Sequence, residues 1–272
     1  MSAITVPQLG RSGRVTQARV VASEWTKFIT LRSTLWSLGI GMLLTLAFPI
    51  IFAAVTGSHW SHMSAHERAD RHPLDIALAG VNVAQLAIAV LGVLVITGEY
   101  STGMIRSTFL AVPKRLPVLW AKLGVYAVVA FVLTLPAVIV SFFVSQAILR
   151  SHHILQISIS APGVLRTLVG GALYVMGVGV FALAIGAIVR NTAGGIALFA
   201  GIFFVIPPLM NILPLSWNNA ISEWLPSEAG RQLFALHRDP SRLAQWPSGA
   251  LFLGYCVLAI AIAAVLLRRR DT

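Results

Sequence analysis

Six long apolar runs divide this sequence, and shorter polar segments rich in Arg, His, Gly or Pro separate them. A helix needs about 20 predominantly apolar residues to cross the hydrocarbon core of a bilayer, and each run meets that length. The pattern therefore predicts an all-α integral membrane protein with six transmembrane helices. We place the six spans at residues 35–56, 76–96, 123–149, 166–189, 193–213 and 248–267.

An amphipathic stretch at residues 15–33 precedes the first span. Read as a helix, its apolar face carries Ala18, Val21, Ala22, Trp25, Phe28 and Ile29. Its other face carries Arg19, Ser23, Thr26, Lys27 and Thr30. A basic amphipathic helix of this kind is typical of a segment that lies in the headgroup region of a membrane. Residues 1–14 are expected to be disordered, and residues 268–272 to form a short tail.

The composition supports a membrane protein. Hydrophobic residues make up 57% and charged residues 11% of the 272 residues, and the mean hydropathy is +0.83, whereas soluble domains carry about 25% charged residues. The net charge of +11 would also suit a nucleic-acid-binding protein. However, the basic residues gather at the edges of the apolar runs, so we reject nucleic acid as a partner. The single cysteine, Cys256, lies inside an apolar run and allows neither an internal disulfide nor a cysteine-based metal site.

The distribution of Lys and Arg predicts the orientation. If the N-terminus is cytoplasmic, the cytoplasmic segments hold 13 of the 20 Lys and Arg residues but only three of the nine acids, a net charge of +10. The outer segments then hold a net charge of +1. Because cytoplasmic loops of membrane proteins are enriched in Lys and Arg, we expect a multi-pass protein of the cell inner (cytoplasmic) membrane. Both termini are then cytoplasmic, and loops 57–75, 150–165 and 214–247 lie outside.

The segment 98–122, between the second and third spans, has a more specific pattern. It contains Glu99, Tyr100, Gly103, Met104, Arg106 and Ser107, followed by Pro113, Lys114 and Arg115. Its apolar residues recur at roughly helical spacing, which predicts a short amphipathic helix at the membrane surface. These residues are Tyr100, Met104, Ile105 and Phe109. Pro113 and Pro117 are expected to end that helix, since proline lacks the N–H donor.

The order Glu-Tyr-x-x-Gly-x-x-Arg, then six intervening residues, Pro-Lys-Arg and a Lys that opens the next span, resembles the loop after the second helix of ABC-2-type transporter permeases. These are the membrane subunits of bacterial ABC exporters. In that family the loop forms a coupling helix that docks on a separate ATPase. The resemblance assigns this role to Glu99, Tyr100, Gly103, Met104, Arg106 and Ser107. It also makes the stretch 15–33 an elbow helix that includes Trp25, Lys27 and Phe28. The alternatives are a basic loop whose charges only set the topology, and an amphipathic lead-in with no partner role.

The resemblance further implies a machine of two permease chains and two ATPase subunits. The second permease is another copy of this chain or a paralogue, and the machine moves a drug, a peptide or a lipid-like substrate out of the cell. ATP and magnesium are bound by the ATPase, so this chain is expected to be neither an enzyme nor the holder of a cofactor. Its three lysines form no Gly-x-x-x-x-Gly-Lys-Ser/Thr motif, and the sequence has no Gly-x-Ser-x-Gly motif of a hydrolase. The segment 214–247 looks similar to the short re-entrant helices that precede the last span in the family.

Two polar residues, Asn82 and Gln85, lie one turn apart in the second span. Polar side chains inside a membrane are costly and usually face protein or a water-filled path. They are therefore candidates for the translocation pathway, and hydrogen bonding between helices is the alternative. In the fifth span, Ala193, Ala197 and Gly201 recur every four residues, which favours the close approach of another helix.

The first outer loop holds four of the seven histidines, and His59, His62 and His66 could share a helix face. A weak metal site is conceivable there, but a solvated polar loop is the better account, so no metal is predicted. The acids Glu223 and Glu228 of the last outer segment are likewise interpreted as solvated loop charges. Two other function classes stay open: a membrane-embedded sensor or assembly protein without transport, and an intramembrane metalloenzyme built on the outer histidines.

Overall fold

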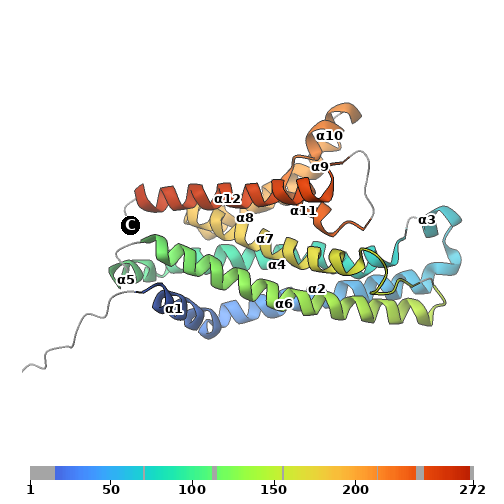
Figure 1. Ribbon diagram of the computed structural model, residues 1–272, viewed down its shortest axis with the longest axis horizontal. Coiled ribbons are helices and arrows are strands. Elements are labelled where there is room, and N and C mark those ends of the chain that lie inside the picture. Colours follow the sequence, from blue (N-terminus) through green and yellow to red (C-terminus); the bar gives the residue numbers. More distant parts are fainter. Residues whose placement is uncertain are drawn as a thin grey trace, which may run out of the picture.

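The computed structural model describes residues 16–69, 71–111, 115–154, 156–212, 214–236 and 242–269. All regular secondary structure within these ranges is helical, and six helices are long and apolar enough to cross a membrane. These helices run back and forth along one direction (Figure 1). The prediction of an all-α protein with six spans is confirmed. The predicted disordered stretch 1–14 and residues 270–272 of the predicted tail lie outside the described residues.

The spans have clear bounds in the structure. They are α2 (Arg32–His59), α4 (Pro73–Ser101), α6 (Arg115–Ser151), α7 (Val164–Val189), α8 (Thr192–Ala200) with its continuation, and α12 (Gln245–Arg269). The continuation of α8 is a π-helical turn, η2 (Gly201–Val205), followed by α9 (Ile206–Met210). Most spans are longer than the apolar runs because polar residues at their ends remain helical. The fifth span ends at Met210, before residue 213, shortly after Pro207 and Pro208.

The start of α6 corrects one expectation. The sequence assigned Pro117 to the end of the preceding short helix, but α5 (Met104–Ala111) ends before it and α6 begins at Arg115. Pro117 therefore lies in the first turn of α6. The N–H groups of a first turn have no acceptor within the helix, so proline is tolerated there. The third span consequently extends eight residues further towards the N-terminus than its apolar run at 123–149.

Helices α4 and α7 form the centre of the bundle, and the other spans pack around them. The two backbones approach closely at Gly92 and Gly179: a Cβ on Gly92 would lie 2.4 Å from the Gly179 carbonyl oxygen. Only glycine fits at such a distance. In contrast, α2, α12 and the continuation of α8 carry several exposed large apolar side chains, as expected for helices that face lipid or another chain.

The bundle has two ends, which we name after the short helices at them. At the α5 end, α1 (Gln17–Thr30), α5 and the last turn of α12 lie together, so the described parts of both terminal segments are at the same end (Figure 1). Arg115 at the start of α6 donates a hydrogen bond of 3.3 Å to the Leu267 carbonyl of α12. At the α3 end lie α3 (Ala65–Ala69) and α10 (Leu215–Ser222), and α10 projects away from the bundle (Figure 1).

Short helices fill the segment before the last span, as the resemblance led us to expect. After α10 come α11 (Pro226–Arg231) and η3 (Gln232–Phe234), which pack against α7 and α12. A Cβ on Gly170 of α7 would lie 2.1 Å from the Leu233 carbonyl oxygen, so this contact also requires glycine. The expectation that Glu228 is a solvated charge is wrong. Its side chain is 13% exposed and pairs with Arg231 and Arg242.

Candidate functional site

Helix α1 packs against α6 at the α5 end of the bundle (Figure 1). It ends at Thr30, and the extended backbone of Leu31 separates it from α2. An amphipathic helix before the first span is therefore present, within the predicted range 15–33.

The face of α1 that packs on the bundle is not the predicted apolar face. The buried residues are Val20, Glu24 and Phe28, whereas Trp25 is 45% exposed. Of the predicted apolar face, Phe28 alone is buried, because the rest of that face points away from the bundle, where a surface helix meets lipid. The face that packs on the protein consists of Val20, Glu24 and Phe28, which follow one another at intervals of four residues, so it includes a carboxylate.

The Phe28 side chain anchors α1 to the bundle. It is 5% exposed, and its ring meets that of Tyr126 on α6 edge to face, with centroids 6.2 Å apart. The Tyr126 hydroxyl donates a hydrogen bond to the Ile88 carbonyl of α4. Three helices are thus joined through one aromatic contact and one hydrogen bond.

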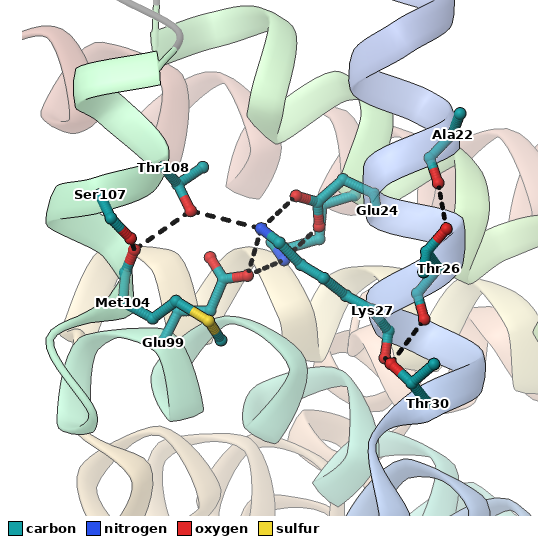
Figure 2. Close-up of polar contacts among 10 residues, drawn as sticks. Ala22, Glu24, Thr26, Lys27, Thr30, Glu99, Met104, Ser107 and Thr108 are labelled. Carbon is teal, nitrogen blue, oxygen red and sulfur yellow. Dashed lines mark hydrogen bonds and ion pairs between the residues drawn. The ribbon is translucent and has the colours of Figure 1, made fainter.

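Four charged side chains meet beside this contact, and we call them the four-charge cluster: Glu24, Lys27, Glu99 and Lys122 (Figure 2). The Lys122 Nζ lies 2.6 Å from Glu24 Oε2 and 3.0 Å from Glu99 Oε1. The Lys27 Nζ lies 2.8 Å from Glu24 Oε1 and 3.0 Å from Glu99 Oε1. Two acids and two bases make the cluster neutral, and it connects α1, α4 and α6.

The cluster is buried. The side chains of Glu24 and Lys122 are 4% exposed and that of Glu99 is 6% exposed, while Lys27 is 22% exposed. Burial alone would raise the pKa of the Glu24 carboxyl, but the Lys122 and Lys27 ammonium groups outweigh it and lower the pKa below its ordinary 4.5. Burial alone would lower the pKa of Lys27, but the Glu24 and Glu99 carboxylates raise it above its ordinary 10.5. These shifts keep Glu24 and Lys27 charged, since each has a buried counter-charge.

The four-charge cluster also reaches α5. The Lys27 Nζ donates a hydrogen bond of 3.3 Å to the Thr108 hydroxyl (Figure 2). The chain leaves α4 at Ser101 and turns at Gly103, whose φ of +71° is the left-handed conformation that glycine adopts without strain. Helix α5 is therefore held by this turn, by Thr108 and by the Ile105 side chain, which is buried.

The residues predicted for coupling occupy different positions. Glu99 lies in the four-charge cluster, and Gly103 forms the turn. Met104 begins α5 and is 37% exposed, and the exposed Ser107 donates a hydrogen bond to the Met104 carbonyl. For Arg106 the structure describes the backbone, within α5, and the side chain lies outside the described part.

Tyr100 contacts a residue that the sequence analysis did not single out. The Arg190 guanidinium lies over its ring, 5.2 Å from the centroid. Arg190 ends α7 with a left-handed φ of +58°, and Asn191 then caps α8 by accepting a hydrogen bond of 2.9 Å from the Gly194 amide. The ends of α4 and α7 are thus linked beside α5.

Gln85 and Asn82 point to different environments. Gln85 is 1% exposed, accepts a hydrogen bond from the Tyr174 hydroxyl of α7 and donates one of 2.9 Å to the Asn82 carbonyl. This is the hydrogen bonding between helices that the sequence left open as the alternative. The Asn82 side chain is exposed and lines an open cavity of about 380 Å³ between α2 and α4. Of the two residues, Asn82 therefore keeps the position expected of a pathway residue.

The outer histidine loop shows local structure. Glu67 accepts a hydrogen bond of 2.7 Å from the Ser64 amide, and the Ser64 hydroxyl accepts one of 3.3 Å from the Glu67 amide. This reciprocal pair is a capping box for α3, and the amide of Ser64 lowers the pKa of the Glu67 carboxyl. Within the described ranges, no three His, Cys, Asp or Glu side chains are close enough to hold a metal ion.

A comparison with known proteins finds no protein-family model that matches this chain and no curated protein with significant sequence similarity to it.

Proposed function

We propose that this chain is the permease subunit of an ATP-driven exporter of the ABC-2 type, and that α5 docks on a separate ATPase subunit. The observation that carries the proposal is the four-charge cluster, which joins α1, α4 and α6 and holds α5 through Thr108. A permease that binds no nucleotide must receive movement through a contact with its ATPase. A short helix tied to several spans suits that task.

The connections of α5 support a transmitting role. A helix attached only by the Gly103 turn could move without moving the bundle. The hydrogen bond from Lys27 to Thr108 instead ties α5 to the four-charge cluster. Because breaking one ion pair in a buried network leaves an uncompensated charge, the cluster resists partial separation. A displacement of α5 would therefore move α1, α4 and α6 together.

The outer surface of α5 supports a docking role. Leu110 is 84% exposed, and Met104 and Ser107 are exposed on the same short helix. Exposed apolar side chains surrounded by polar ones are common anchors at protein interfaces. Arg106, on the same helix, has a guanidinium that can form forked hydrogen bonds with an acidic partner.

Charge supports a cytoplasmic position for the α5 end in the cell inner membrane. Its described basic residues include Arg19, Lys27, Arg32, Arg115, Lys122, Arg190, Arg268 and Arg269. Such an excess is expected of cytoplasmic segments. The α3 end would then face outward.

A second permease chain, either a copy or a paralogue, fits the exposed faces of α2 and α8. Span α8 with its continuation is the least buried of the six. A Cβ on Gly201 would meet no atom within 4 Å, so the stripe of Ala193, Ala197 and Gly201 leaves room for a neighbouring helix. Asn82 lines the open cavity between α2 and α4, so it would lie beside the α2 part of the meeting face. We propose that the pathway for a drug, peptide or lipid-like substrate forms there.

Co-purification with an ATPase encoded beside this chain tests the proposal. We expect the wild-type chain to bind the ATPase and to raise its ATP hydrolysis, and Leu110→Asp to abolish binding. Ile212→Asp, at a residue that is 78% exposed at the opposite end, is the matched control and should bind normally. If the folded wild-type chain recruits no ATPase, the result favours a sensor or assembly protein.

A further inference from the structure

A cavity of about 190 Å³ lies beside the four-charge cluster. Apolar side chains of α1, α4 and α6 form most of its wall, among them Phe28, Leu91, Val95 and Val125. Glu24, Lys27, Glu99 and Lys122 form its polar side. A space with one charged and one apolar side suits an amphiphilic molecule.

The cavity opens to the surface of the bundle. Leu31, Ser33, Ser101 and Thr102 line it and are exposed. They belong to the start of the first span and the end of the second, which in a membrane lie at the level of the headgroups. Met104 also lines the cavity, and its unbranched side chain can change conformation to admit a molecule.

One side-chain oxygen of Glu99, a residue that lines the cavity, is buried and lacks a hydrogen-bond partner. Glu99 Oε1 accepts from both Lys27 and Lys122, whereas Glu99 Oε2 is buried and has no partner. In Figure 2, dashed lines reach one of the two Glu99 oxygens and not the other. Buried carboxylate oxygens in proteins are almost always paired, because leaving one unpaired costs free energy. Since the cluster is already neutral, a neutral donor such as a hydroxyl group would satisfy Oε2 without adding charge.

We propose that this cavity binds an apolar molecule that carries a single hydroxyl group, such as a phenol, a medium-chain alcohol or the hydroxyl end of a lipid. Glu99 Oε2 is buried, so the flexible Met104 side chain shifts to let the hydroxyl reach this oxygen and donate to it. The apolar part fills the space beside Phe28 and Val95. The size is adequate, since a cavity of about 150 Å³ accommodates benzene. The proposal concerns binding at the α5 end and does not depend on whether the chain transports a substrate.

Photolabelling of the full chain in nanodiscs tests this site. The probe is a medium-chain alcohol that carries a diazirine. We expect labelling within 17–30 and 91–104, and competition by 4-propylphenol on the order of 10-fold better than by its methyl ether, which lacks the donor. Label spread over the lipid-facing surfaces of all spans, or equal competition by the two compounds, overturns the proposal.

Two glycine variants separate binding from folding. Gly98 lines the cavity, and a Cβ there would meet no atom within 4 Å, so Gly98→Leu should fill the cavity without moving the backbone. Gly124→Leu is the matched control, because Gly124 also has open space but does not line the cavity. We expect labelling to fall at least about 10-fold in Gly98→Leu alone, with both variants melting normally. Undiminished labelling in a folded Gly98→Leu variant overturns the site.

Native mass spectrometry identifies the source of the hydroxyl group. The chain purified from its host membrane is compared with the Gly98→Leu variant. A hydroxyl-bearing lipid that remains on the wild-type chain and is lost from the variant makes the lipid the occupant. If no lipid remains but the alcohol probe still labels the site, the occupant is a soluble small molecule. A chain that retains no lipid and takes up no probe contradicts the proposal.

Discussion

Lys122 and Glu24 are separated by 98 positions in the sequence, yet the Lys122 Nζ lies 2.6 Å from Glu24 Oε2, with both side chains 4% exposed. The pair joins a helix that precedes the first span to the start of the third span. Removing either charge would leave the four-charge cluster with one uncompensated charge, which is strongly unfavourable in a low-dielectric interior. The position of α1 on the bundle is therefore coupled to the ionisation of these two residues.

Removing one member of this pair should destabilise the protein more than removing both. Glu24→Leu leaves Lys122 with Glu99 alone inside the bundle, so we expect a loss of about 3–5 kcal/mol. In the double variant Glu24→Leu, Lys122→Met, no uncompensated charge remains from the pair, and most of the loss should be recovered. Thermal unfolding in detergent measures both effects.

The control for this experiment is Asp75→Asn, which removes an exposed carboxylate from the first turn of α4. It should cost no more than about 1 kcal/mol, the usual value for a charge at a helix N-terminus. A double variant that is less stable than both single variants would contradict the pairing.

The attachment of α1 should depend on pH in a definite direction. The pKa of Glu24 is lowered from 4.5, so its stabilising contribution is present above about pH 4.5 and is lost as the pH falls further. The pKa of Lys27 is raised from 10.5, so its contribution is present below about pH 10.5 and is lost as the pH rises through the folded value. The attachment should thus be constant between these limits.

A nitroxide at the exposed position Ser23 measures this attachment by electron paramagnetic resonance, in a Cys256→Ala background. We expect the label to become mobile in acid and in strong alkali while the helix content of the spans persists. The double variant Glu24→Gln, Lys27→Gln should lose both transitions. A wild-type label that becomes mobile near neutral pH instead would show that other groups control the attachment.

Close packing of α4 on α7 gives a prediction about stability alone. In Gly92→Ala the new Cβ would lie 2.4 Å from the Gly179 carbonyl oxygen, so the helices must separate. Overpacking typically costs about 1–3 kcal/mol. In Gly98→Ala, on the same helix, the new Cβ meets no atom within 4 Å, and the stability should change little. Equal melting temperatures for the two variants would contradict this packing.

Much of the fold follows from local sequence patterns, whereas the candidate site does not. Six apolar runs sufficed to predict six spans, because a bilayer sets the length of each. The face of α1 that packs on the protein could not be predicted, because periodicity shows that a helix has an apolar face but not whether lipid or protein covers it. Glu24 lies midway between the buried Val20 and Phe28, and this spacing was the one available signal.

Contacts between residues far apart in the sequence account for the other features that could not be predicted. Gln85 is buried because the Tyr174 hydroxyl, 89 positions away, donates a hydrogen bond to it. No partner could be predicted for Lys122, because its two carboxylate partners lie on other helices. The pairing of Glu99 with a base on the first helix could be anticipated, since charges at the same end of a bundle tend to meet. Its role in coupling stays a prediction.

The proposed orientation predicts which loops a membrane-impermeant thiol reagent can reach. Ser64 lies at the α3 end and Ser107 on α5, and both are exposed. In intact cells, Ser64→Cys should be labelled and Ser107→Cys should react only after the membrane is opened. The native Cys256 is buried and contributes little background. Labelling of Ser107→Cys but not Ser64→Cys in intact cells would reverse the topology.

The transmission of movement through α5 should be separable from the binding of the ATPase to α5. Thr108→Val keeps the size of the side chain but removes the hydroxyl that accepts from Lys27 Nζ. The exposed surface formed by Met104, Ser107 and Leu110 is unchanged. We therefore expect Thr108→Val to bind the ATPase normally but to reduce both the stimulation of ATP hydrolysis and the export of substrate, whereas Leu110→Asp abolishes binding itself.

Ser107→Ala is the matched control, because its hydroxyl bonds only to the Met104 carbonyl of its own helix. Normal export by Thr108→Val would mean that movement reaches the spans through the Gly103 turn and the buried Ile105 side chain, and the four-charge cluster would then only fasten α1 to the bundle.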